Sequence, residues 1–163
     1  MKQEANAKDV AKLLLQFTVA EPPHRQVLMS TLSGLDESQI AKIRDEIMFL
    51  DLVVFGSIIQ TERVKQYWPT SERILVEYLA CLKESLDLTD GGFDGLLHSL
   101  ETRETAYKPV LEKPPNVARF RVGQTFAVVC GFENDPTVEI AGTGEFVSVV
   151  NYVGDLVTHY NVV

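Results

Sequence analysis

The sequence is poor in cysteine and histidine, with two cysteines and three histidines in 163 residues. Cys81 and Cys130 are too few and too far apart for a disulfide framework or a zinc site. Each lies among apolar neighbours, which is typical of a buried free thiol. We therefore expect no bound metal and no cofactor, and a reducing compartment such as the cytoplasm fits best.

Positive charge is also scarce, because 15 lysines and arginines face 23 aspartates and glutamates, giving a net charge of −8. Nucleic acids and anionic membranes both require cations to neutralise phosphate, so neither is an expected partner. Long apolar runs are missing as well. The most apolar segment, residues 47–59, is too short to span a bilayer and contains Asp51. The first residues lack the apolar core of a signal peptide.

Motifs of nucleophilic or phosphate chemistry are absent from the sequence: it has no G-x-S-x-G, no cysteine with a nearby histidine and no phosphate-binding loop. Asp51 is the one candidate catalytic residue, because a carboxylate within an apolar helix is expected to have a raised pKa. The alternative is that Asp51 pairs with an arginine or lysine of a neighbouring helix. Without a second catalytic partner, the protein is more plausibly not an enzyme.

Helical periodicity dominates the first two thirds of the chain. Apolar residues recur at helical spacing in five segments, and Asp36 with Gln39 has the pattern of a capping box. Prolines 22 and 23 separate the first two segments. The predicted helices cover residues 7–19, 23–34, 36 to about 65, 71–86 and 93–107.

The composition changes at Lys108, where a connector rich in proline (109, 114 and 115) precedes segments rich in β-branched and aromatic residues. This pattern predicts an α+β fold: a helical bundle of about five helices over residues 1–112 and a small antiparallel β-meander over residues 113–163. The strand spacing suits an SH3-like barrel, an analogy that fixes no function.

The predicted strands at the end of the chain form a hairpin closed at Gly154 and Asp155. Both faces of this hairpin would be largely apolar, so both must be covered. We therefore predict a homodimer or a stable complex with a partner protein, with Phe146, Tyr152 and Tyr160 on the interaction surface.

Residues 90–101 partly match a calcium-binding EF-hand loop, with Asp90, Asp94, Gly95 and Glu101 at matching positions. Gly92 removes one ligand, so a capped helix start is the favoured interpretation. The sequence thus predicts a non-catalytic interaction or regulatory protein. The alternatives are a small-ligand or calcium-binding module and an enzyme with a site near Asp51.

Overall fold

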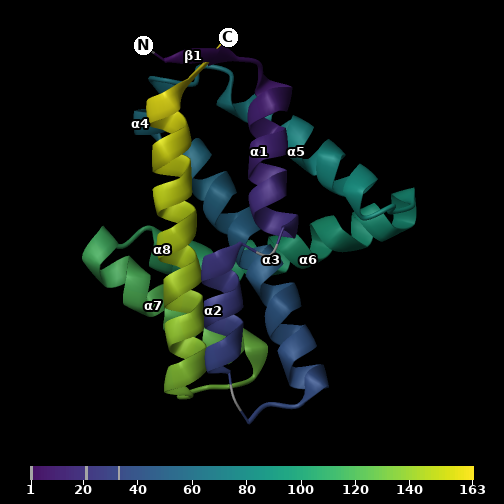
Figure 1. Ribbon diagram of the computed structural model, residues 1–163, viewed down its shortest axis with the longest axis vertical. Coiled ribbons are helices and arrows are strands. Elements are labelled where there is room, and N and C mark those ends of the chain that lie inside the picture. The colour runs from purple at the N-terminus through teal and green to yellow at the C-terminus, as the bar shows by residue number, and fades with distance from the viewer. Residues whose placement is uncertain (1, 21, 33) are drawn as a thin grey trace.

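The computed structural model describes residues 2–20, 22–32 and 34–163. Within these ranges the chain forms eight helices and one pair of short parallel strands (Figure 1). The helices are α1 (Ala7–Val19), α2 (Pro23–Thr31), α3 (Glu37–Ile59), α4 (Glu62–Lys65), α5 (Ser71–Ser85), α6 (Asp90–Leu111), α7 (Pro115–Cys130) and α8 (Pro136–His159), and the strands are β1 (Gln3–Ala5) and β2 (Tyr160–Val162). Helix α3 lies at the centre and contacts α1, α5, α6, α7 and α8.

The helices predicted in the first two thirds of the chain agree with the structure. Asp36 accepts a hydrogen bond from the Gln39 backbone N–H at 2.9 Å, and the side-chain oxygen of Gln39 accepts one from the Asp36 backbone N–H, so the predicted capping box is confirmed. The long third helix ends at Ile59, earlier than predicted, because Thr61 caps the separate short helix α4. Helix α6 begins at Asp90 and continues through Pro109, where an extended connector was predicted.

The predicted α+β fold is wrong, because residues 113–163 form two long helices instead of an antiparallel meander or an SH3-like barrel. The turn-like segments around this region start helices. Pro115 occupies the first turn of α7, where its fixed φ and missing N–H are tolerated. Asp135 caps α8 by accepting hydrogen bonds from the amides of Thr137 and Val138, and Pro136 again opens the helix.

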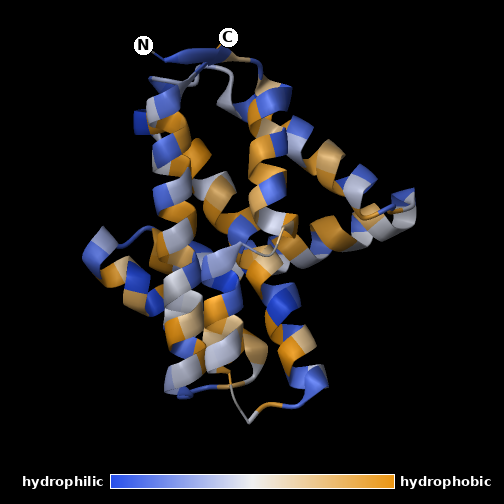
Figure 2. Ribbon diagram, viewed as in Figure 1, coloured by the Kyte–Doolittle hydropathy of each residue, from blue (hydrophilic) through white to orange (hydrophobic). Residues whose placement is uncertain are grey.

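The inward face of α8 explains why a segment rich in β-branched residues is helical. Its buried residues recur every three or four positions, which is the stripe of a helix packed on other helices. They are Val138, Ala141, Gly142, Glu145, Phe146, Val149, Val153 and Leu156. Figure 2 shows apolar and polar residues sharing each turn of α8. None of the helices in the described ranges is long and apolar enough to cross a membrane.

Two glycines set the distance between α7 and α8. A Cβ on Gly123 would collide with the Thr143 side chain and with the carbonyl oxygen of Glu139. A Cβ on Gly142 would lie 2.5 Å from the Cβ of Phe126. The two helix axes can therefore approach this closely only because neither crossing position carries a side chain.

The only strands in the described ranges join distant parts of the chain (Figure 1). β1 pairs with β2 in parallel, with Gln3 opposite Tyr160 and Ala5 opposite Val162. The indole N–H of Trp68 donates to the carbonyl of Tyr160 at 3.1 Å. The predicted hairpin at Gly154 and Asp155 is wrong, because both residues lie inside α8.

The predicted boundary between residues 112 and 113 falls in the turn between α6 and α7. One apolar cluster includes residues from both sides of it, such as Leu50 and Val54 of α3 and Val149 and Val153 of α8. The predicted division into two domains is decided by whether residues 1–112 alone unfold cooperatively.

Candidate functional site

Asp51 lies on α3 with no exposed surface and is paired with an arginine. One Nη of Arg25, from α2, donates to Asp51 Oδ2 at 2.8 Å. The other Nη donates to the carbonyl of Thr18 at 2.8 Å, at the end of α1. The alternative prediction for Asp51, a pair with a basic residue of a neighbouring helix, is confirmed.

A second buried carboxylate shares the same guanidinium. Glu145, on α8, accepts a hydrogen bond from the Nη2 of Arg25 at 2.7 Å and has no exposed surface. Its other oxygen lies 3.3 Å from the Nε2 of His24, whose side chain is partly exposed. We call these four residues, His24, Arg25, Asp51 and Glu145, the buried ion cluster.

The electrostatics of the cluster are dominated by burial. Burial raises the pKa of Asp51 well above its usual value, the nearby Glu145 raises it further, and Arg25 opposes both. Burial lowers the pKa of Arg25, but the charges and hydrogen bonds of Asp51 and Glu145 outweigh this, so the net direction is upward. Two carboxylates therefore compete for one cation inside the protein, an arrangement that is strongly disrupted if the cation is removed.

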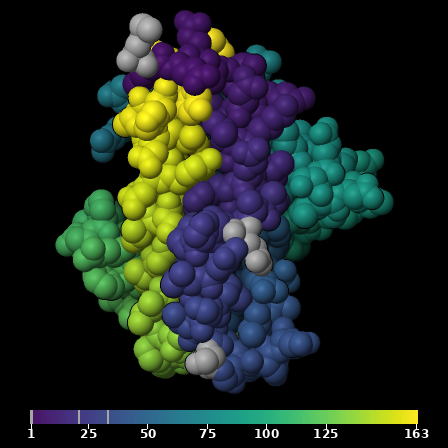
Figure 3. Space-filling view, in the orientation of Figure 1, coloured from purple at the N-terminus to yellow at the C-terminus, as the bar shows by residue number. Residues whose placement is uncertain are grey.

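Helix α2 covers the cluster and is held by it. Arg25 is the only buried side chain in α2 within the described residues. In Figure 3, α2 lies in the angle between α8 and α3. Leu28 also packs on Gly144, where a Cβ would come within 3.0 Å of the leucine. The ion cluster thus fixes α2 to the bundle, and its two carboxylates lie fully buried beneath this helix.

A second buried pair links α3 to α6. The Nε of Arg103 donates to Glu46 at 3.1 Å, and the Tyr107 hydroxyl donates to the same carboxylate at 3.0 Å. Burial raises the pKa of Glu46, while Arg103 opposes the shift. Burial also raises the pKa of the nearby Cys130 thiol to about 12, which makes this cysteine a poor nucleophile.

Residues 90–101, the partial match to an EF-hand loop, form the first half of α6, so the favoured interpretation of a capped helix start is confirmed. Thr89 caps this helix by accepting from the amide of Gly92 at 3.2 Å. Asp90 pairs with Lys83, which lowers the pKa of its carboxyl. In the described ranges, no three side chains among histidine, cysteine, aspartate and glutamate converge on a common point.

Two hollows that are open to solvent lie along α8, and they extend inward to its buried residues Phe146 and Val153. One hollow of about 500 Å³ lies between α4 and α8, and another of about 430 Å³ lies between the start of α7 and α8. Val150 lines both hollows, so they meet on α8. We call the two together the α8 groove; its apolar lining residues are Ile58, Val64, Tyr67, Leu111, Pro115, Ala118, Phe146, Val147, Val150, Val153 and Val157.

The charges of the α8 groove are opposite to those of the whole protein. Its described lining residues include the cations Lys2, Arg63, Lys113 and Arg119 and no carboxylate. The full chain carries a net charge of −8. An apolar floor with a cationic edge on an acidic protein is a surface suited to an anionic, amphipathic ligand.

The three residues predicted to form an interaction surface lie in different surroundings. Phe146 lines the α7 end of the groove. Tyr152 faces α1, where its ring stacks on Phe17 at 4.6 Å and its hydroxyl donates to the carbonyl of Leu13 at 3.0 Å. Tyr160 is the first residue of β2. Burial raises the pKa of Tyr152, and the nearby Tyr160 raises it further. The structure therefore does not bring the three together on one open face.

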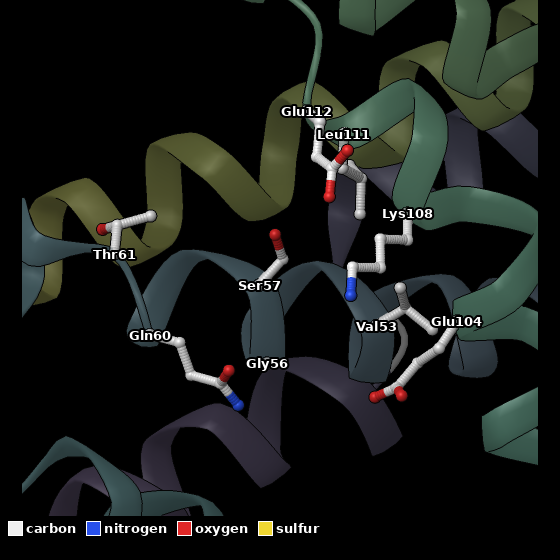
Figure 4. Close-up of a pocket in the computed structure, with 9 residues that line it drawn as sticks. All are labelled: Val53, Gly56, Ser57, Gln60, Thr61, Glu104, Lys108, Leu111 and Glu112. Carbon is white, nitrogen blue, oxygen red and sulfur yellow. The ribbon is translucent and has the colours of Figure 1, made fainter.

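A third hollow of about 430 Å³ lies between α3 and α6 and adjoins the α8 groove at Thr61 and Leu111 (Figure 4). Gly56 and Ser57 of α3 leave space there, and a Cβ on Gly56 would meet nothing within 4 Å. In Figure 4 the side chains of Ser57 and Lys108 point into the hollow, and Glu104 and Glu112 line its edge. Unlike that of the α8 groove, its lining carries charges of both signs.

Sequence reasoning missed Arg25, Glu145 and the four groove cations. One signal was available for Glu145, which is the only charged residue between Glu139 and Asp155, just as Asp51 is isolated in its own apolar segment. A carboxylate buried in an apolar helix needs a partner for its charge, so each of these two residues indicates a buried pair. Comparison of the chain with family models, with curated proteins and with solved structures found no match.

Proposed function

We propose that this protein is a non-catalytic interaction module that binds a partner protein through the α8 groove. The observation that carries the proposal is the exposed apolar floor of the groove. Val147, Val150 and Tyr67 leave 38, 39 and 46 % of their surfaces exposed within two adjoining hollows. Clustered exposed apolar residues with a polar edge are typical of protein contact sites.

The buried ion cluster supports a non-catalytic function. Its carboxylates are fully buried beneath α2, and Arg25 already occupies the space between them. An enzyme with a site near Asp51 would need α2 to move before substrate reached the carboxylate. The free, buried state of Cys81 and Cys130 supports a reducing compartment such as the cytoplasm.

The proposal is tested with two matched valine substitutions. Val150→Glu places a charge on the groove floor, whereas Val76→Glu makes the same change at a valine on α5 that is 68 % exposed. Both variants should keep the wild-type circular dichroism spectrum and melting temperature. We expect proteins retained by the immobilised wild type from a cell lysate to be lost with Val150→Glu and retained with Val76→Glu. Equal retention by all three would overturn the proposal.

A second copy of the chain is an alternative occupant of the same face. In a twofold dimer, each groove would face its own copy, so that Arg63 and Lys113 would oppose like charges. This repulsion makes a different protein the favoured partner. Light scattering at several concentrations decides between the two, because a homodimer would persist in the wild type and dissociate in Val150→Glu.

A small-ligand module is the second candidate function, and the α3–α6 hollow favours it. Its volume of about 430 Å³ lies within the range of small-molecule sites, roughly 300–1,000 Å³. Lys108, Ser57 and Gln60 supply donors to one polar ligand. A thermal-shift screen of polar metabolites, repeated with Lys108→Met, tests it: a stabilising compound that loses its effect in the variant would support this function.

A further inference from the structure

Building on the proposed function, we infer that the partner segment is an acidic amphipathic helix of about three turns, with its apolar stripe on the floor of the α8 groove. The groove combines an apolar floor with the cations Lys2, Arg63, Lys113 and Arg119. The inference rests on three features: the charge, the length and an open position on the groove floor.

The charge of the groove requires a partner rich in carboxylates. Lys2 already donates to the carbonyl of Val157 and lies over the ring of Tyr67, and Arg119 lies over the ring of Phe120. By contrast, Arg63 and Lys113 have no ion-pair partner within the described residues, and both are exposed. Arg63 lies in the hollow beside α4 and Lys113 in the hollow beside α7. The partner should therefore carry acidic residues toward both ends of its apolar stripe.

The length of the floor fits a short helix. Val147 and Val157 line opposite ends of the groove and are ten positions apart on α8, which is about 15 Å at 1.5 Å per residue. A partner helix of about ten residues covers this distance in roughly three turns. Its apolar residues would recur at i, i+4 and i+7, as in other helices that bind in a groove.

Gly154 provides a place for one of those apolar side chains. It lines the groove between Val150 and Val157, and a Cβ built on it would meet nothing within 4 Å. The missing side chain leaves open space on the groove floor, which a side chain of a facing helix can occupy. Filling this hole should block the partner without disturbing the fold.

The concave shape favours a helix over an anionic membrane, which would contact a protruding rather than a hollowed face. The net charge of −8 also repels an anionic bilayer beyond the groove. Membrane binding is therefore an outcome that the experiment must be able to detect.

The experiment uses designed peptides of about 14 residues, labelled for fluorescence anisotropy, and the full chain. The first peptide has leucines at i, i+4 and i+7 and glutamates on both sides of this stripe. The second replaces each glutamate with lysine, and the third has the composition of the first with the leucines distributed around the helix. The protein variants are Arg63→Glu, Gly154→Leu and, as a matched charge control on α5, Arg73→Glu.

We expect the acidic amphipathic peptide to bind the wild type and Arg73→Glu equally. Its affinity should fall by about tenfold or more with Arg63→Glu and when salt is raised from about 0.05 to 0.2 M, because the attraction is between exposed charges. Gly154→Leu should abolish binding while its melting temperature stays at or above that of the wild type. The lysine peptide and the redistributed peptide should not bind.

Equal binding of the lysine peptide would overturn the inference that the partner helix is acidic, although the groove would still be a binding site. Equal binding of the redistributed peptide would show that charge acts without an apolar stripe and would also overturn it. Binding to vesicles containing about one third phosphatidylserine, if it is lost with Arg63→Glu, would overturn the inference, because the ligand of the groove would then be an anionic membrane. Absence of binding by every peptide overturns the inference, whereas the pull-down with Val150→Glu still decides the proposed function separately.

Discussion

Replacing Arg25 with methionine tests the structural role of the buried ion cluster. The substitution keeps an unbranched side chain but removes the cation that binds Asp51 at 2.8 Å and Glu145 at 2.7 Å. Both carboxylates would remain fully buried without a counter-charge. Removing one partner of such a cluster costs about 3–5 kcal/mol. For a chain of 163 residues each kcal/mol corresponds to roughly 2–4 °C, so the melting temperature should fall by roughly 6–20 °C at pH 7.

The pH dependence of this loss follows from the direction of the Asp51 pKa. The native pKa of Asp51 lies above its ordinary value of 3.8, so its contribution to stability is present below pH 3.8 and is lost as the pH rises through the native pKa. Arg25 opposes this shift, so removing Arg25 raises the native pKa of Asp51 further. The deficit of Arg25→Met relative to the wild type should therefore be smaller at pH 4 than at pH 7.

The measurement is thermal unfolding followed by circular dichroism between pH 4 and pH 8. Arg73→Met is the matched control, because Arg73 is exposed on α5 and its substitution should change stability by no more than about 0.5 kcal/mol. The triple variant Arg25→Met/Asp51→Asn/Glu145→Gln should recover part of the loss, since neutral side chains need no cation. An Arg25→Met variant as stable as the control, or a deficit independent of pH, would refute the role given to the cluster.

Four further predictions concern other parts of the molecule. Gly123→Ala should destabilise by about 1–3 kcal/mol in chemical unfolding because its Cβ collides with the backbone of α8, whereas Gly95→Ala, in open space on α6, should stabilise by up to about 1 kcal/mol. With its pKa at about 12, Cys130 should react with a thiol reagent at pH 8 far more slowly in the native protein than in denaturant, as peptide mass spectrometry can show. Residues 1–112 alone should melt without cooperativity in circular dichroism, because α8 and its Glu145 are missing; a cooperative melt would support the boundary predicted from sequence. Calcium titration should leave the melting temperature unchanged in both the wild type and Glu101→Gln, because residues 90–101 are helical.

The sequence predicted the helices up to about residue 107 because several local signals agree there. In α3 the capping box of Asp36 and Gln39, the apolar periodicity and the absence of proline all favour the same element. The ends were less accurate, since Ile59 ends α3 where a further turn and a half was expected. Such boundaries depend on which residue caps the next helix, here Thr61.

The error over α7 and α8 has an identifiable cause. Valine is frequent in both helices and threonine occurs in both, and β-branched residues favour strands only weakly compared with tertiary packing. The predicted hairpin was apolar on both faces. This is the result of assigning the two-residue period of a strand to a helical stripe, because its apolar residues are then distributed over both faces. Gly131, at a φ of 82°, ends α7, and Asp135 followed by Pro136 starts α8. Read as helix signals rather than a turn, these residues predict the two helices.

The candidate sites could be predicted only in part. Asp51 was identified because a lone carboxylate in an apolar segment needs a partner. The partner itself was beyond reach, because Arg25 is 26 positions from Asp51 and 120 from Glu145. Contacts over such distances in sequence depend on how α2, α3 and α8 pack. The groove cations were missed for the same reason, since they come from segments that are brought together only by the fold.

The two faces of α8 allow stability and function to be tested separately. Val147, Val150, Gly154 and Val157 recur at intervals of three or four and line the open groove, while Glu145 belongs to the adjacent buried face and binds Arg25. A substitution on the open face leaves the buried carboxylate and its cation in place, so it should reduce partner binding at unchanged melting temperature. A substitution at Glu145 should lower the melting temperature even in the purified protein, with no partner present. A groove variant that unfolds the protein as strongly as a Glu145 variant would mean that the valines of this face stabilise the fold, and the exposed floor would no longer indicate a partner.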